Sequence, residues 1–216
     1  MPARFEAPLG SVLPRAFFAR PVLDVARDCV GMILTHKTPL GVASGRIVES
    51  EAYRGPEDLA AHSAGGRRTK RTEAMFGPAG HAYIFLLYGM HWAFNMVAGL
   101  EGQPHAVLVR AIEPVEGLAL MAERRGVNAS KRELTNGPGK VCAALGLTGA
   151  AYGVDLCRRA DPEAPPLDTE LYLTWGPARP IGRSPRINVD YAGAWAARPW
   201  RFFERGNRYV SVPPRE

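Results

Sequence analysis

The sequence contains 216 residues, of which 46% are apolar and 22% charged, a composition typical of a soluble globular protein with one well-buried core. No stretch reaches the roughly 18 consecutive apolar residues that a membrane-spanning helix needs, which excludes that class of element. The formal charge of +6 favours an anionic partner, with nucleic acid as the first candidate and a membrane surface as the second.

The cysteines and the N-terminus indicate the compartment. Cys29, Cys142 and Cys157 are widely spaced and form no C-x-x-C pair, so neither a disulfide framework nor a zinc site is indicated. The N-terminus lacks the apolar segment of a signal peptide. We therefore expect a soluble protein that is not secreted, located in the cytoplasm or, in a bacterium, at the nucleoid.

The first third of the chain predicts a flexible arm, a helix and a hairpin. Residues 1–12 contain proline and glycine and predict a flexible N-terminal arm, which leaves 13–216 as a single domain. Apolar residues at helical spacing predict a short helix over 21–29. Two strands joined by a turn at 38–41 are expected next, over 32–36 and 42–53.

The rest of the chain alternates irregularly between strand and helix patterns. β-forming residues predict strands over 82–88, 90–97 and 106–112, and helical spacing predicts helices over 113–125 and 138–145. Residues 159–168 predict a surface loop, and short strands are expected over 171–175, 185–189 and 209–212. Without regular β-α-β alternation, the pattern predicts an α+β fold: a single domain with a curved, mainly antiparallel, open-barrel-like sheet flanked by helices.

Residues 46–71 combine acid/base groups with cations. The strand pattern places Glu49, Glu51 and Tyr53 on one face, Gly55-Pro56 ends the strand, and His62 precedes Gly65-Gly66. Four cations follow within five residues: Arg67, Arg68, Lys70 and Arg71. Separately, the glutamates could form a solvated face, His62 could be structural and the cations could serve solubility. Together, where a strand end meets a glycine-rich loop, they favour a functional site.

The motif E-S-E-A-Y-R-G-P-E-D-x-A-x-H-S-x-G-G-R-x-T-x-R resembles the alkyladenine (3-methyladenine) DNA glycosylase family. The likeness continues in the same order through Y-I-F-L-L-Y-G-M, V-L-V-R-A-I-E-P, T-N-G-P-G-K and A-R-P-W-R-F-F, and covers about residues 13–212. It implies a monofunctional glycosylase that flips 3-methyladenine, hypoxanthine or ethenoadenine out of double-stranded DNA. It also implies that no metal and no cofactor is needed. A search for damage along DNA favours a monomer.

The resemblance implies which groups are catalytic. Glu51 would activate the attacking water, and Arg110 and the backbone carbonyl of Val189 would help to hold that water. The spacing alone does not choose between Glu51 and Glu49. Without the resemblance, Arg110 could equally be a sheet-edge cation that reaches water.

The resemblance also implies a base pocket lined by Tyr53, His62, Phe85 and Asn95, because an everted base needs aromatic faces on both sides. The alternative for the aromatic residues is ordinary core packing. Animal members of the family carry tyrosine at the position of Phe85, so stacking is retained here and a hydroxyl contact is lost. Asn95 would disfavour undamaged guanine, or could simply be satisfied by backbone groups.

Two further sets of residues would contact DNA. Tyr88, braced by Met90, would enter the duplex and fill the gap left by the flipped nucleotide; alternatively, Tyr88 folds back onto the sheet. Phosphate contacts are expected from Arg67, Arg68, Lys70, Arg71 and Lys140. Lys140 follows Gly137-Pro138-Gly139 at a predicted helix start, but this segment lacks the spacing of a nucleotide-binding P-loop.

Two other functions are compatible with the sequence. A non-catalytic binder of distorted nucleic acid would use the same cations and Tyr88, but would release no base. A hydrolase or transferase of free nucleosides or small anionic substrates would use Glu51 but would not need the cationic loop. Tyr88 and the cations favour a duplex substrate.

Overall fold

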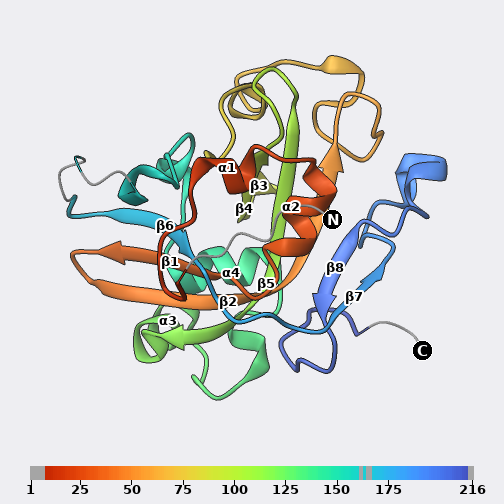
Figure 1. Cartoon of the computed structure of the whole chain (residues 1–216). Coiled ribbons are helices and arrows are strands. Elements are labelled where there is room, and N and C mark those ends of the chain that lie inside the picture. Colours follow the sequence, from red (N-terminus) through yellow and green to blue (C-terminus); the bar gives the residue numbers. More distant parts are fainter. Residues whose placement is uncertain (1–7, 161–162, 164–166, 214–216) are drawn as a thin grey trace.

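The structure is a computed structural model that describes residues 8–160, 163 and 167–213 (Figure 1). Its α-helices are α1 (Arg15–Phe18), α2 (Val22–Asp28), α3 (Leu118–Arg125) and α4 (Pro138–Leu145). Its strands are β1 (Ile33–Thr38), β2 (Gly41–Arg54), β3 (Ala82–Leu87), β4 (His91–Ala98), β5 (His105–Glu116), β6 (Glu170–Thr174), β7 (Ile181–Ser184) and β8 (Arg201–Glu204). Six short 3-10 helices complete it: η1 (Ala64–Gly66), η2 (Glu73–Phe76), η3 (Arg132–Leu134), η4 (Gly149–Ala151), η5 (Arg158–Ala160) and η6 (Asp190–Trp195).

All eight strands belong to one antiparallel sheet that does not close into a barrel, which confirms the α+β fold with an open antiparallel sheet. Strand β2 is its centre. One edge of β2 pairs with β5, and the other pairs first with β1 and then with β8, so the sheet divides along this strand (Figure 1). The end of β2 that carries the two glutamates therefore has a strand on each side.

The pairing register aligns residues from five strands in one row. Tyr83 on β3 lies opposite Asn95 on β4, Asn95 opposite Leu108 on β5, and Leu108 opposite Glu51 on β2. Arg201 on β8 lies opposite Glu51 on its other side. Because directly paired residues of an antiparallel sheet project to the same face, this row brings residues distant in sequence onto one surface.

The register between β2 and β5 shifts between Ile47 and Glu49 and again between Glu49 and Ser50, which leaves Val48 and Arg110 without a partner in the ladder. Such bulges bend the strand and re-aim side chains, and they are frequent beside active sites. Here the irregularity lies where Arg110 reaches both glutamates.

The two faces of the sheet have different roles. Ala52, Val107 and Met96 lie in neighbouring strand positions and belong to the main apolar core, together with residues of α1, α2 and α4. The next residues along the strands, among them Tyr53 and Leu108, belong to a smaller cluster on the opposite face. The helices thus support the sheet from one side and leave the other for the site.

Several expected elements were placed wrongly. The helix expected over 113–125 begins only at Leu118, because β5 continues to Glu116 and Gly117 adopts a left-handed conformation. The strands expected over 185–189 and 209–212 are absent, and the C-terminal strands are instead β7 and β8. Helix α1 was not anticipated. The other expected helices and strands are present with shifts of a few residues.

The two ends of the described chain pack on the sheet. Gly10 donates its amide to the carbonyl of Trp175 at 2.8 Å, and Val12 forms a bridge with Thr174. Residues 1–7 of the expected arm lie outside the described residues.

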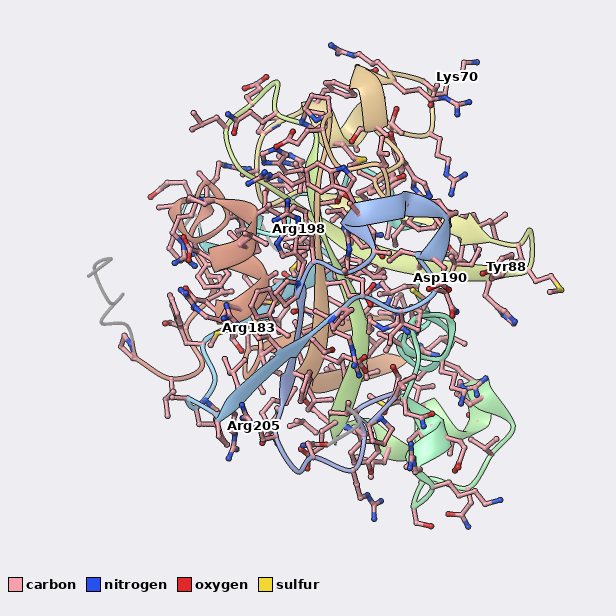
Figure 2. All side chains as sticks on the ribbon, turned by 90° about the vertical axis from the view of Figure 1, so that its right-hand side faces the viewer. Lys70, Tyr88, Arg183, Asp190, Arg198 and Arg205 are labelled. Carbon is pink, nitrogen blue, oxygen red and sulfur yellow. The ribbon has the colours of Figure 1, made fainter. Side chains whose placement is uncertain are left out.

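The β3–β4 hairpin extends past its neighbours and carries Tyr88 near its tip (Figure 2). Within the described part of the chain, no helix is long and apolar enough to cross a membrane.

Candidate active site

A cavity of about 470 Å³ opens on the sheet face opposite the main core. Its walls come from β2 to β5, the segment between β2 and β3, and residues 187–191 after β7. Eight of the fourteen residues expected at the site line it: Tyr53, His62, Arg71, Phe85, Tyr88, Asn95, Arg110 and Val189. The row of paired residues across the sheet is the reason that they meet here.

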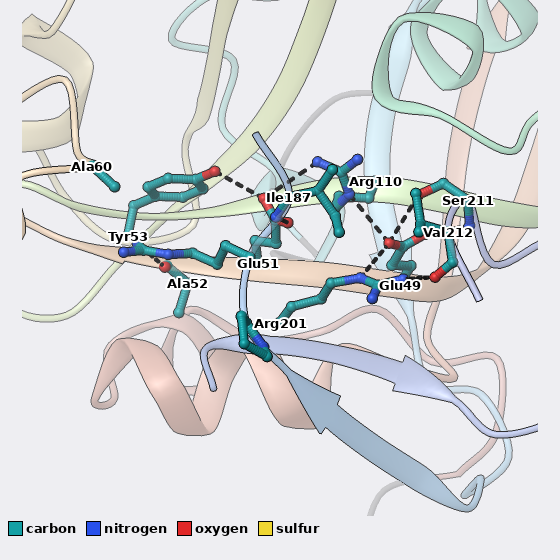
Figure 3. Close-up of polar contacts among 12 residues, drawn as sticks. Glu49, Glu51, Ala52, Tyr53, Ala60, Arg110, Ile187, Arg201, Ser211 and Val212 are labelled. Atoms are coloured by element: carbon teal, nitrogen blue, oxygen red, sulfur yellow. Dashed lines mark hydrogen bonds and ion pairs between the residues drawn. The ribbon is translucent and has the colours of Figure 1, made fainter. Parts of the chain in front are cut away.

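Glu51 lies directly behind this lining and has no exposed surface. Its carboxylate accepts hydrogen bonds from the Tyr53 hydroxyl at 2.8 Å, the Ile187 amide at 2.8 Å and the Arg110 guanidinium at 3.4 Å. Figure 3 shows these contacts, and all three donors belong to residues that line the cavity. The carboxylate is thus held in place by three groups that line the cavity.

Glu49 has different partners. Its carboxylate accepts from Arg201 at 2.6 Å, from Arg110 at 3.2 Å, and from the amide and hydroxyl of Ser211 at 2.6 and 2.9 Å. These bonds fix the C-terminal segment to β2 (Figure 3). The spacing of the two glutamates left their roles open, and the contacts now separate them: Glu49 joins strands, whereas Glu51 adjoins the cavity.

Arg110 bridges both carboxylates. Burial alone would lower the pKa of its guanidinium, but the charges of Glu51 and Glu49 outweigh burial and raise it above its ordinary value. Arg110 therefore remains a cation, and its position beside Glu51 argues against a sheet-edge residue that only reaches for water.

Aromatic and polar side chains form the cavity walls. The Tyr53 hydroxyl points at Glu51, and burial followed by the charge of Glu51 raises the pKa of this tyrosine well above its ordinary value. Phe85 and His62 pack edge to face, with ring centroids 4.5 Å apart. Asn95 donates its amide to the carbonyl of Tyr83 at 3.1 Å while still lining the cavity. Three aromatic rings, those of Tyr53, His62 and Phe85, therefore contribute to the cavity walls.

The turn between β3 and β4 presents Tyr88 to solvent. Tyr88 and Gly89 both have positive φ, 51° and 71°, and Met90 closes the turn by donating its amide to the carbonyl of Leu87 at 3.0 Å. A left-handed conformation is unfavourable for tyrosine and usually reflects a local constraint. Tyr88 is 82% exposed and Met90 71% exposed, so neither folds back onto the sheet.

The expected phosphate-binding cations occupy different positions. Arg67, Arg68, Lys70 and Arg71 are all exposed, but Arg68 forms an ion pair with Glu73 at 2.6 Å, and Arg71 turns into the cavity. Lys140, in the first turn of α4, donates to Asn136 at 2.8 Å and lies outside the cavity lining. The sequence placed these cations in one class, whereas their surroundings differ.

The segment after β7 contributes more than the sequence indicated. Besides Val189, its residues Ile187, Asn188 and Tyr191 line the cavity. Asn188 has a φ of 58°, and the Ile187 amide bonds a carboxylate instead of a neighbouring strand, which explains why no strand forms here. A buried arginine, Arg186, precedes them. The asparagine in the run R-I-N-V-D could have indicated from the sequence that no regular strand forms here, because asparagine tolerates the left-handed backbone conformation.

Comparisons with a family model and with curated relatives point to the same family. The model of the methylpurine-DNA glycosylase family matches residues 16–208. A relative from Methanocella arvoryzae, named "Putative 3-methyladenine DNA glycosylase", is 45% identical over 93% of this chain and 96% of its own length. Relatives of the same printed name from Myxococcus xanthus and Desulfitobacterium hafniense are 46% and 44% identical, over 94% and 93% of this chain and 94% and 98% of theirs.

Proposed function

The chain belongs to the methylpurine-DNA glycosylase family, and on that premise we propose that it excises damaged purines from duplex DNA by hydrolysis. The substrates would be alkylated or deaminated bases such as 3-methyladenine, hypoxanthine and ethenoadenine, flipped into the cavity. The observation that carries the proposal is the buried Glu51 carboxylate, bonded to three groups that line an aromatic cavity.

The reaction assigns a role to each group. The C1′–N bond breaks and its electron pair leaves with the base, while a water oxygen bonds to C1′ and one water proton passes to Glu51. The carboxylate also offsets the positive charge that develops on the sugar. Arg110 and the Val189 carbonyl would hold the water, since both residues line the cavity. The product would be an abasic site.

Water must reach a carboxylate that has no exposed surface in this structure. The Tyr53 hydroxyl occupies one carboxylate oxygen and its ring lines the cavity, so this side chain stands between Glu51 and an incoming base. A small rotation of Tyr53 as it stacks on the base would uncover that oxygen. The bonds from Ile187 and Arg110 would keep Glu51 oriented during the change.

Water as the nucleophile predicts hydrolysis without strand cleavage. A lyase forms a Schiff base with an amine, and none of the described residues that line the cavity is a lysine. We therefore expect a monofunctional enzyme, from which borohydride traps no covalent adduct with DNA. Tyr88 and the other groups of the cavity all come from one chain, which is compatible with an enzyme that acts as a monomer.

The test is base release from duplexes carrying one hypoxanthine or one ethenoadenine, with Glu51→Gln as the variant. Glutamine keeps the shape but cannot take a proton, so we expect release to fall by about 10²- to 10⁴-fold while lesion binding is retained. The measurement is single-turnover release together with binding of the same duplex.

Glu49→Gln is the matched control. This change weakens the bonds to Arg201 and Ser211, so it should lower the melting temperature. Base release per folded molecule should fall much less than it does in Glu51→Gln. Binding without release by the unaltered protein on these lesions and on 3-methyladenine would instead support a non-catalytic binder.

A further inference from the structure

Arg71 belongs to the wall of the cavity although its sequence neighbours face solvent. Its guanidinium lies over the Phe85 ring, 4.7 Å from the centroid, and donates to Nε2 of His62 at 3.1 Å. Both of these residues line the cavity with it. The nearby carboxylate of Glu73 is occupied by Arg68 at 2.6 Å, so it does not neutralise Arg71.

The hydrogen bonds around His62 fix its protonation. An arginine can only donate, so Nε2 must be the acceptor and the proton of a neutral imidazole must be on Nδ1. Nδ1 then donates to the Tyr83 hydroxyl oxygen at 2.7 Å. Burial, followed by the charges of Arg71 and Arg67, lowers the pKa of His62 to about 4. At neutral pH the charge on this wall therefore resides on Arg71 and not on His62.

We propose that Arg71 is a specificity-determining residue that favours excision of uncharged damaged purines, such as hypoxanthine, over cationic ones, such as 3-methyladenine. This inference rests on the proposed glycosylase function. It assigns to Arg71 a contact with the base, in place of the phosphate contact expected from its position in the basic loop.

The physical reason is the direction in which charge moves. When a neutral purine leaves with the bonding electron pair, negative charge develops on the base, and a fixed cation beside the pocket stabilises it. A cationic purine leaves as a neutral molecule and carries positive charge while it binds, so the same guanidinium repels it. Arg71 therefore acts in opposite directions on the two classes of lesion.

The experiment compares Arg71→Gln with the unaltered protein on two duplexes, one with hypoxanthine and one with 3-methyladenine. Single-turnover release is measured at subsaturating enzyme, and the readout is the ratio of the two second-order rate constants. Loss of the cation should shift this ratio towards 3-methyladenine by on the order of tenfold. Arg71→Lys retains the charge and should keep the ratio near its original value.

Lys70→Gln is the matched control for lost charge in the same loop. Lys70 is exposed and lies outside the cavity lining, so its loss should weaken binding of both duplexes alike and leave the ratio unchanged. If Arg71→Gln behaves like Lys70→Gln, Arg71 is only a phosphate contact and the proposal is wrong. It is also wrong if Arg71→Lys shifts the ratio as far as Arg71→Gln does.

A second measurement reports on the contact without DNA. Because Arg71 helps to depress the pKa of His62, Arg71→Gln should raise the pKa of this imidazole from about 4 towards its ordinary value, as followed by NMR titration. An unchanged titration would contradict the contact itself. If the unaltered protein releases neither base, the glycosylase assignment fails, and that outcome differs from release with an unchanged ratio.

Discussion

Tyr88 and Glu51 show how much a single position depends on its surroundings. Glu49 and Glu51 are residues of the same type, two positions apart. Nevertheless, the carboxylate of Glu51 adjoins the cavity, whereas that of Glu49 binds the C-terminal segment. Tyr88 lies in a strained backbone conformation with its ring in solvent. Strain without a stabilising contact costs stability and is expected where the side chain acts on a partner.

Tyr88→Gly should therefore separate stability from activity. Glycine tolerates the positive φ, so we expect the free energy of unfolding to rise by about 0.5–1 kcal/mol, while base release falls because nothing fills the gap in the duplex. Denaturant unfolding and single-turnover release measure the two effects. Tyr88→Phe, which keeps the ring, should retain release; equal loss in both variants would argue against a wedge.

The segment between β7 and η6 is held in place by one buried ion pair. The Arg186 guanidinium donates to the Asp58 carboxylate at 2.5 and 2.8 Å and to the Ala52 carbonyl at 2.9 Å. It also lies over the Tyr53 ring, 4.8 Å from the centroid. The next residue, Ile187, donates its amide to Glu51. The Arg186–Asp58 ion pair therefore positions one of the groups that hold the candidate catalytic carboxylate.

Arg186→Met should impair both stability and release. It leaves Asp58 buried without its cation, which costs about 3–5 kcal/mol, and it frees the Ile187 amide from Glu51. Release per folded molecule, measured at saturating enzyme, should fall. Arg46→Met is the matched control, because Arg46 pairs with Glu113 and Glu204 at a site outside the cavity lining. Arg46→Met should lose stability but retain base release. If Arg186→Met also retains its release rate, Arg186 does not position the Glu51 carboxylate.

Elements were predictable where local patterns decided them. The hairpins and α4 follow from β-forming runs and helical spacing, and all are present. The segments over 113–125 and 185–189 were misassigned because pairing decided them: β2 extends β5 to Glu116, and Glu51 takes the Ile187 amide that a strand would have used. Periodicity contains no information about such distant partners.

The positive charge of the whole molecule is not gathered on one surface. In Figure 2, Lys70 lies at the upper right, above Tyr88, whereas Arg183 and Arg205 lie in the lower left part of the molecule. Of these three cations, only Lys70 belongs to the loop whose next residue, Arg71, lines the cavity. Net charge alone therefore predicts an anionic partner but not the surface that it occupies.

Binding of duplex DNA should be strongly salt-dependent, and the two groups of cations should contribute unequally. In Lys70→Gln, the slope of log K for binding against log salt concentration should become less negative by about 0.9, because one phosphate contact is lost. Arg205→Gln removes the same charge at a position away from Tyr88 and outside the cavity lining, so it should leave the slope unchanged. Titrations of one lesion duplex at several salt concentrations measure both. Equal effects would mean that only net charge matters.

By itself, the sequence determined the α+β class, most strands, the family likeness and the types of group that the site contains, because periodicity, turn residues and motifs are local properties. Through the resemblance the sequence also chose Glu51 over Glu49. Only the tertiary structure showed that Glu51 adjoins the cavity while Glu49 ties down the C-terminal segment, placed Arg71 in the cavity wall, and brought Ile187 to the carboxylate. These outcomes depend on pairing register and on contacts between residues far apart in the chain, which no local pattern encodes.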